Sequence, residues 1–101
     1  MTERRRLANR RLCQTFEPEV GGLRYICSVG RFPDGSIGEL FLSNHKSNST
    51  ADTNARDAAI AFSFAVQHGA DPEKIRQALS RDSGGRATGP LGRALDLVSE
   101  D

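Results

Sequence analysis

The chain has 101 residues, 14 lysines and arginines against 13 aspartates and glutamates, and a formal net charge of +1. Domains commonly have about 100–150 residues, so this length indicates one domain and excludes a large self-contained enzyme. No apolar run approaches the roughly 18 residues that a membrane helix needs, so we expect a cytoplasmic protein without membrane contact. Two cysteines, Cys13 and Cys27, are too few for a disulfide scaffold or a zinc ribbon, and we expect no metal site.

Positive charge is concentrated in residues 1–11, which hold five arginines and one glutamate and carry +4, against −3 on the other ninety residues. We expect a basic, flexible arm over residues 1–11 and a single domain over residues 12–101. One interpretation is an arm that contacts nucleic acid through Arg4, Arg5, Arg6, Arg10 and Arg11. The other is a solvated tail, because no aromatic side chain lies between the arginines to stack on bases.

Three strand-like runs follow, at residues 13–20, 23–32 and 36–43, and Gly21-Gly22 and Asp34-Gly35 separate them. Both pairs suit two-residue hairpin turns, because glycine accepts a positive φ. The pattern therefore predicts an antiparallel meander of three strands.

These turns fix the register of the sheet, because side chains alternate between its two faces. Phe16 then pairs with Cys27, and Leu40 pairs with Val29. A three-residue second turn would face Glu39 inward, so we favour the two-residue turn. The predicted core face holds Phe16, Val20, Leu23, Tyr25, Cys27, Val29, Leu40 and Leu42.

The opposite face of the sheet is mainly polar, with Glu19 across from Arg24. Ile26 and Phe41 lie on it as near neighbours, and together they are a candidate surface for docking a partner. Cys13 has the opposite parity to Cys27, so the two thiols are predicted to point to different faces and not to form a disulfide.

The hydrophobic period changes to 3.6 after a polar loop, and it predicts a helix from Thr50 to a stop at Gly69. The second half of this Ala-rich helix is apolar almost all round, with Ser63 as its polar residue, so it must be covered on more than one side. Two short helices, starting at Pro72 and Pro90, or a second subunit would cover it. We therefore expect an α+β fold in which the long helix and two short helices pack on one sheet face.

Lys46, Ser49 and Thr50, at the start of the long helix, are candidates for binding an anion, because unpaired amides, two hydroxyls and an ammonium converge there. The alternative is that Ser49 or Thr50 only caps the helix. The Arg81 to Gly89 stretch is a second candidate, because two arginines flank Gly84-Gly85 and glycine lets backbone amides approach an anion. It lacks the spacing of a Walker or dinucleotide motif, so we interpret it as a flexible connector. His45 and His68 lack ligand spacing, and no catalytic residues are predicted.

An ordered set of motifs covers residues 9–98: N-R-R (9–11), TFEPEVGGLRY (15–25), VGRFPDGSIGELFL (29–42), K-S-N-S-T (46–50), AFSFAVQHG (61–69) and GPLGRALDLV (89–98). This set resembles the C-terminal domain of adenosylcobalamin-dependent, class II ribonucleotide reductases. It also resembles short free-standing bacterial proteins named for the TSCPD domain.

The resemblance implies that adenosylcobalamin and the radical cysteine belong to a large barrel, which this sequence lacks. We therefore expect no cofactor bound by this chain alone. Lys46, Ser49 and Thr50 match positions of the family, whereas Asn48 stands where a glycine is expected. The Thr-Ser-Cys-Pro-Asp motif and the cysteine-rich tail of such domains are absent.

Two functions remain open. The first is an accessory or binding module of deoxyribonucleotide synthesis, related to ribonucleoside-diphosphate reductase but not catalytically self-sufficient. Such a module binds a reductase catalytic chain or a nucleotide. It forms a homo-oligomer if a second copy covers the long helix. The second is a small regulatory protein that binds nucleic acid through the arginine arm.

Overall fold

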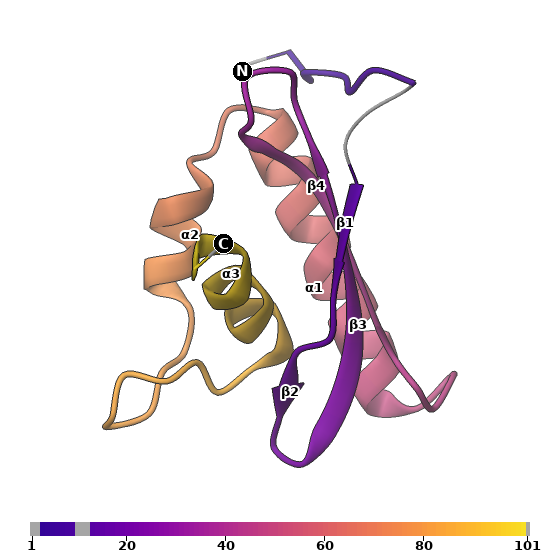
Figure 1. Ribbon diagram of the computed structural model, residues 1–101, viewed down its shortest axis with the longest axis vertical. Helices are drawn as coiled ribbons and strands as arrows, with labels where there is room; N and C mark the ends of the chain where they lie inside the picture. Colours follow the sequence, from indigo (N-terminus) through magenta and orange to yellow (C-terminus); the bar gives the residue numbers. More distant parts are fainter. Residues whose placement is uncertain (1–2, 10–12, 101) are drawn as a thin grey trace.

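The computed structural model describes residues 3–9 and 13–100, and it has the predicted α+β fold (Figure 1). A β-sheet precedes three helices; α1 and α3 pack on the sheet, and α2 packs against α3. The elements are β1 Cys13–Phe16, β2 Glu19–Val20, β3 Leu23–Arg31, β4 Ile37–Asn44, α1 Thr50–Gln67, α2 Pro72–Ala78 and α3 Pro90–Glu100. Among the described residues, no helix has the length and hydrophobicity needed to cross a bilayer.

β3 is the central strand, with β1 and β2 on one side and β4 on the other. The predicted first strand is divided into β1 and β2, because Pro18 lacks the N–H that would continue the ladder. Its carbonyl still accepts a hydrogen bond from the Tyr25 amide at 2.9 Å. The predicted register is confirmed on both sides of the break, since Phe16 pairs with Cys27 before it and Val20 pairs with Leu23 after it.

The prediction for the second hairpin turn is wrong in length. Phe32 N donates to the Ser36 carbonyl, so the loop has three residues, and Gly35 takes the positive φ of +89° that ends such loops. Gly38 then lies as one extra residue between the pairs that β4 makes with Arg31 and Gly30. This bulge shifts the register by one residue, which restores the predicted pairing further along β4.

Polar side chains of α1 occupy the outer edge of β4. Asp52 Oδ1 accepts from the amide of the last β4 residue at 2.8 Å. Ser63 Oγ accepts from Leu40 N at 2.9 Å and lies 3.1 Å from the Leu40 carbonyl. Gln67 Nε2 donates to the Gly38 carbonyl at 2.8 Å. The edge strand therefore has hydrogen-bond partners without a neighbouring strand.

The core lies between the sheet and the helices. The predicted inward residues Tyr25, Cys27, Val29, Leu40 and Leu42 are all buried against α1 and α3. Leu23 is an exception: it is 43% exposed at the β2–β3 turn, where no helix reaches it. From the helices, the core receives Ala55, Ala59, Phe62, Val66, Leu91, Ala94, Leu95 and Val98.

Candidate functional site

Ser49 is the N-cap of α1. Its hydroxyl oxygen accepts from Asp52 N at 3.1 Å, and its proton is donated to the Lys46 carbonyl at 2.7 Å. The side chains of Lys46 and Thr50 are exposed beside it. Asn48 has φ of +63°, a conformation that asparagine tolerates, which accounts for asparagine where glycine is expected. The Ser49 hydroxyl, which we predicted to bind an anion, therefore caps the helix.

The Asp52 carboxylate fills the space at this helix start. It is buried, and it accepts from the amides of Asn44 and Asn48 and from Arg56 Nε at 2.8, 3.3 and 2.9 Å. The Asn44 amide, followed by Arg56, lowers the pKa of Asp52 below its ordinary value. A negative charge already lies at the positive end of α1. Anion binding by Lys46, Ser49 and Thr50 stays a prediction.

Four large apolar side chains lie exposed on neighbouring parts of β3, β4 and α1, and we call them the apolar surface. Ile26 and Phe41, which the sequence singled out, are 37% and 56% exposed, and the strand register places them diagonally on one sheet face. Ile60 and Phe64 of α1 are each 50% exposed. Phe41, Ile60 and Phe64 line one hollow of about 140 Å³. The surface therefore continues from the sheet around β4 onto α1.

The exposure of Ile60 and Phe64 follows from the apolar second half of α1. Phe62 and Ala59 take the side that faces the core and are buried. The other side of the helix is left without cover by the described residues, although the sequence predicts cover on more than one side. Contiguous exposed apolar side chains of this size mark interaction surfaces more often than scattered ones.

The N-terminal segment, residues 3–9, forms part of the rim of this surface. Arg4 Nε donates to Gln67 Oε1 at 2.6 Å, and its guanidinium carbon lies 4.9 Å from the centre of the Phe64 ring. Arg5 stacks on Phe32 at 3.7 Å and pairs with Asp34 at 3.1 Å. Two of the five predicted nucleic-acid contacts thus have partners on the body of the protein. Arg6 is exposed, and Arg10 and Arg11 lie outside the described residues.

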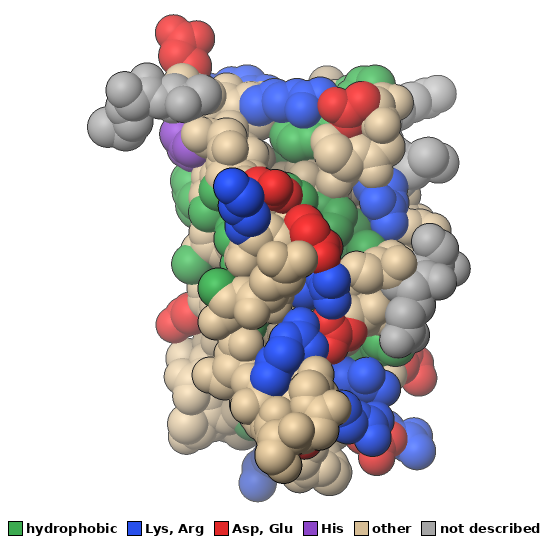
Figure 2. Space-filling view, turned by 90° about the vertical axis from the view of Figure 1, so that its left-hand side faces the viewer, with side chains coloured by type: hydrophobic (Ala, Val, Ile, Leu, Met, Phe, Trp, Pro, Cys, Tyr) green, Lys and Arg blue, Asp and Glu red, His purple; other side chains and the backbone are tan. Residues whose placement is uncertain are grey.

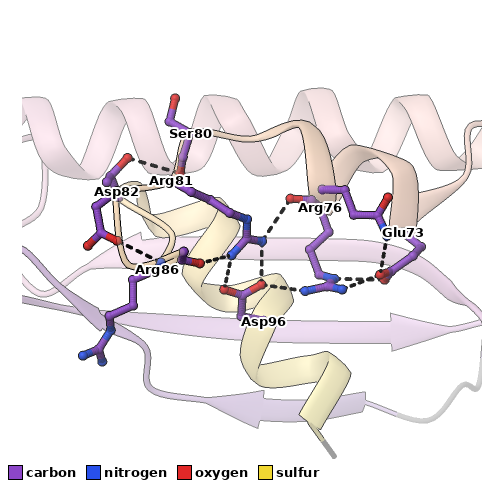
Figure 3. Close-up of polar contacts among 10 residues, drawn as sticks. Glu73, Arg76, Ser80, Arg81, Asp82, Arg86 and Asp96 are labelled. Atoms are coloured by element: carbon purple, nitrogen blue, oxygen red, sulfur yellow. Dashed lines mark hydrogen bonds and ion pairs between the residues drawn. The ribbon is translucent and has the colours of Figure 1, made fainter.

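A second polar site joins α2, α3 and the loop between them (Figure 3). Arg81 makes two hydrogen bonds to the Asp96 carboxylate, at 2.8 and 2.9 Å, and Arg76 adds a third at 2.9 Å. Arg76 also pairs with Glu73. Arg81, followed by Arg76, lowers the pKa of Asp96 to about 2. Figure 2 shows basic and acidic side chains intermingled on the face that α2 presents.

The segment that we interpreted as a flexible connector is an ordered hairpin. Arg81 and Ala87 form a β-bridge, and Asp82 Oδ1 accepts from the amides of Gly84 and Arg86 at 2.9 and 3.0 Å. Sequence analysis missed this order because the Asp96 cluster that fixes its base comes from a later helix. The one local signal is Asp82 two residues before Gly84, a typical Asx turn.

Further potentially reactive side chains among the described residues include the cysteines and His68. Burial raises the pKa of the Cys27 thiol to about 12, which keeps it protonated, while Cys13 is exposed and both cysteines are free. His68 Nδ1 lies 2.8 Å from the Phe64 carbonyl. Across residues 3–9 and 13–100, no three potential metal ligands come together.

Comparison with known proteins supplies the remaining evidence. The chain is 36% identical over 78 residues, 77% of its length, to the vitamin B12-dependent ribonucleotide reductase of Agrobacterium fabrum. It is 33% identical over 69 residues, 68% of its length, to the enzyme of the same name from Bradyrhizobium diazoefficiens. The chain spans only 6% of the length of each of these relatives. No family model and no solved structure matches it.

The pocket between the β2–β3 turn and α3 has a volume of about 390 Å³. That this chain alone binds no cofactor stays a prediction. The resemblance to TSCPD-domain proteins stays a prediction. The resemblance to ribonucleotide reductases is confirmed: over roughly three quarters of its length, this chain is related to a segment of vitamin B12-dependent ribonucleotide reductases.

Proposed function

We propose that this chain is a binding module of ribonucleotide reduction, which docks on a reductase polypeptide through the apolar surface and does not reduce nucleotides alone. The observation that carries this proposal is the uncovered group of Ile26, Phe41, Ile60 and Phe64. The match to only 6% of each relative supports the proposal, because in those enzymes the matching segment is a small part of a much larger polypeptide.

The composition of the apolar surface suits a protein partner. Interfaces place aromatic and aliphatic side chains at their centre and surround them with polar groups, among which arginine is enriched. Here Phe41 and Phe64 lie at the centre, and Arg4 and His68 lie against Phe64 at the rim. A lipid or nucleic-acid partner would call for a more strongly basic surface.

The chemistry of the cysteines supports a role without autonomous catalysis. A radical reductase needs a reactive cysteine in an enclosed site with reducing thiols nearby. Cys27 is buried with a raised pKa, and Cys13 is exposed on the edge of the sheet. Neither cysteine lines the hollow of about 140 Å³ or the pocket of about 390 Å³.

Binding to a reductase tests the proposal directly. A vitamin B12-dependent reductase from which the matching segment has been removed is titrated with the full chain in a calorimeter. We expect saturable binding that Phe64→Gln weakens at least about tenfold, since truncating a central aromatic commonly costs about 2 kcal/mol or more. The matched control is Leu23→Gln, which alters a similarly exposed side chain at the β2–β3 turn, outside the apolar surface.

Two results would contradict the proposal. The first is the absence of binding to the shortened reductase. The second is equal loss of binding in both variants, which places the contact elsewhere. Nucleotide reduction by the chain alone, with cobalamin and a dithiol, would refute the statement that it is not self-sufficient.

A further inference from the structure

A pocket of about 390 Å³ opens between the β2–β3 turn, the hairpin after α2 and the first turn of α3. It lies apart from the apolar surface and shares no lining residue with it. Its mouth includes Gly21 and Gly22, whose φ values of +61° and +76° require glycine and leave that side without side chains. The lining residues are Glu19, Val20, Gly21, Gly22, Asp82, Arg86, Ala87, Thr88 and Arg93.

Arg93 lines this pocket, and one donor of its guanidinium group is unpaired. Its Nε atom is closed to solvent and has no hydrogen-bond partner among the described residues, so a ligand in the pocket meets Nε only when the side chain turns. A buried donor on a charged group costs free energy when it is left unpaired, and most such groups in proteins have a partner. The guanidinium group binds carboxylate and phosphate oxygens in pairs, so an oxyanion is the ligand that satisfies it best.

Arg86 adds a second charge at the same pocket. The hairpin fixes its backbone, because the Arg86 amide donates to Asp82 at 3.0 Å. Its side chain points away from the Asp96 cluster, where Arg76 and Arg81 are bound (Figure 3). Within residues 3–9 and 13–100, the guanidinium groups of Arg86 and Arg93 form no ion pair.

The two acidic residues of the lining are occupied elsewhere. Glu19 lies 3.6 Å from Arg24 across the β2–β3 pair. Asp82 Oδ1 accepts from the amides of Gly84 and Arg86, which hold the hairpin closed. Within the described residues, neither of these carboxylates forms an ion pair with Arg86 or Arg93.

We propose that this pocket binds the oxyanion of a small molecule, a phosphate or a carboxylate group, between Arg93 and Arg86. Arg93 is the buried anchor, and Arg86 closes on the ligand from the hairpin. The proposal does not depend on docking to a reductase, because no residue of the apolar surface takes part in it.

Titration followed by NMR tests the site. The Nε–H resonances of the arginines are recorded in the full chain while inorganic phosphate, acetate or chloride is added at constant ionic strength. We expect a saturable shift of the Arg93 resonance with phosphate or with acetate, and the stronger of the two identifies the ligand group. Chloride should give no saturable shift, because a single ion does not match the paired donors of a guanidinium.

Two variants keep the test decisive. Arg86→Gln should weaken binding about tenfold, the usual cost of losing one hydrogen bond to a charged group. Lys74→Gln, which removes an exposed cation on α2 that does not line the pocket, should leave the affinity unchanged. The proposal is overturned if neither anion shifts Arg93 saturably, if chloride does so equally, or if the two variants behave alike. Arg86 is exposed, so its replacement should leave the fold intact, and circular dichroism checks this.

Discussion

The Asp96 carboxylate holds three structural elements together. Arg81 projects from the hairpin and Arg76 from α2, and both guanidinium groups contact the Asp96 carboxylate (Figure 3). The bidentate contact with Arg81 is geometrically the strongest kind of ion pair. The ionised Asp96 side chain therefore helps to position the hairpin. The hairpin is also one wall of the pocket that Arg86 and Arg93 line, which we call the arginine pocket.

Because Asp96 must be ionised to pair with the two arginines, the strength of this contact depends on pH. The pKa of Asp96 is lowered from 3.8 to about 2, so its contribution to stability is complete above pH about 4 and is lost as the pH falls through 2. At pH 6, we expect Asp96→Asn to melt at a lower temperature than the unmodified chain. At pH 2, we expect the two chains to melt at nearly the same temperature. Thermal unfolding followed by circular dichroism between these pH values checks this.

Asp57→Asn is the matched control for that series, because Asp57 is exposed on α1. Its melting temperature should follow that of the unmodified chain at each pH. If the difference caused by Asp96→Asn stays constant from pH 6 to pH 2, the ionised form of Asp96 is not what stabilises the fold.

At the scale of elements, polar side chains of α1 bond to the backbone of β4 and so fix how the helix lies along this strand. Ser63 is central to it, because its hydroxyl meets both the amide and the carbonyl of Leu40. Ser63→Ala leaves a buried amide without a partner, and we expect the free energy of unfolding to fall by about 1–3 kcal/mol. Urea unfolding measures the loss, and hydrogen exchange should show reduced protection at the Leu40 amide.

Thr53→Ala on the same helix is the control, because Thr53 is exposed and its replacement reports only the helix propensity of alanine. Unchanged protection of the Leu40 amide in Ser63→Ala would contradict the role of Ser63. A loss of protection spread evenly over β3 and β4 would instead indicate general destabilisation.

The strand register could be predicted because the period of two leaves few ways to bury Tyr25, Cys27 and Val29 together. The turn length could not, because Gly38 compensates for the longer loop and the final pairing is the same with either turn. The division of the first strand at Pro18 has a local signal, since proline lacks the donor that the ladder needs.

The candidate sites were predictable to different degrees. Strand parity identified Ile26 and Phe41, because it assigns each residue to a face. Ile60 and Phe64 were implied by an all-round apolar helix, but the sequence does not reveal which side stays uncovered. The arginine pocket was not predictable, because tertiary packing brings Arg86 and Arg93 to the glycine turn that begins at Gly21.

At the scale of the whole molecule, the N-terminal segment is attached to the far end of α1 and to the second hairpin. The Arg5 amide donates to the Gln67 carbonyl at 2.5 Å, and the side chains of Arg4 and Arg5 have partners nearby. This attachment limits the charge that the arm offers to a nucleic acid.

The salt dependence of nucleic-acid binding tests this limit. With Arg4 and Arg5 held on the body, at most three arginines of the arm remain, so any binding should fall with salt with a logarithmic slope no steeper than about −2.7. Fluorescence anisotropy with a labelled oligonucleotide measures the slope, and a chain lacking residues 1–8 is the control. A slope near −4.5, expected of all five arginines, would mean that Arg4 and Arg5 leave the body on binding.

The helix side chains along β4 also determine how this protein can associate. Many domains capture a peptide by adding it as a new strand to an open sheet edge, and aggregates grow in the same way. At β4, Ser63 contacts the amide and the carbonyl of Leu40, and Gln67 donates to the carbonyl of Gly38. A peptide must displace these side chains before it can pair with those groups, which disfavours β-augmentation along this part of the edge.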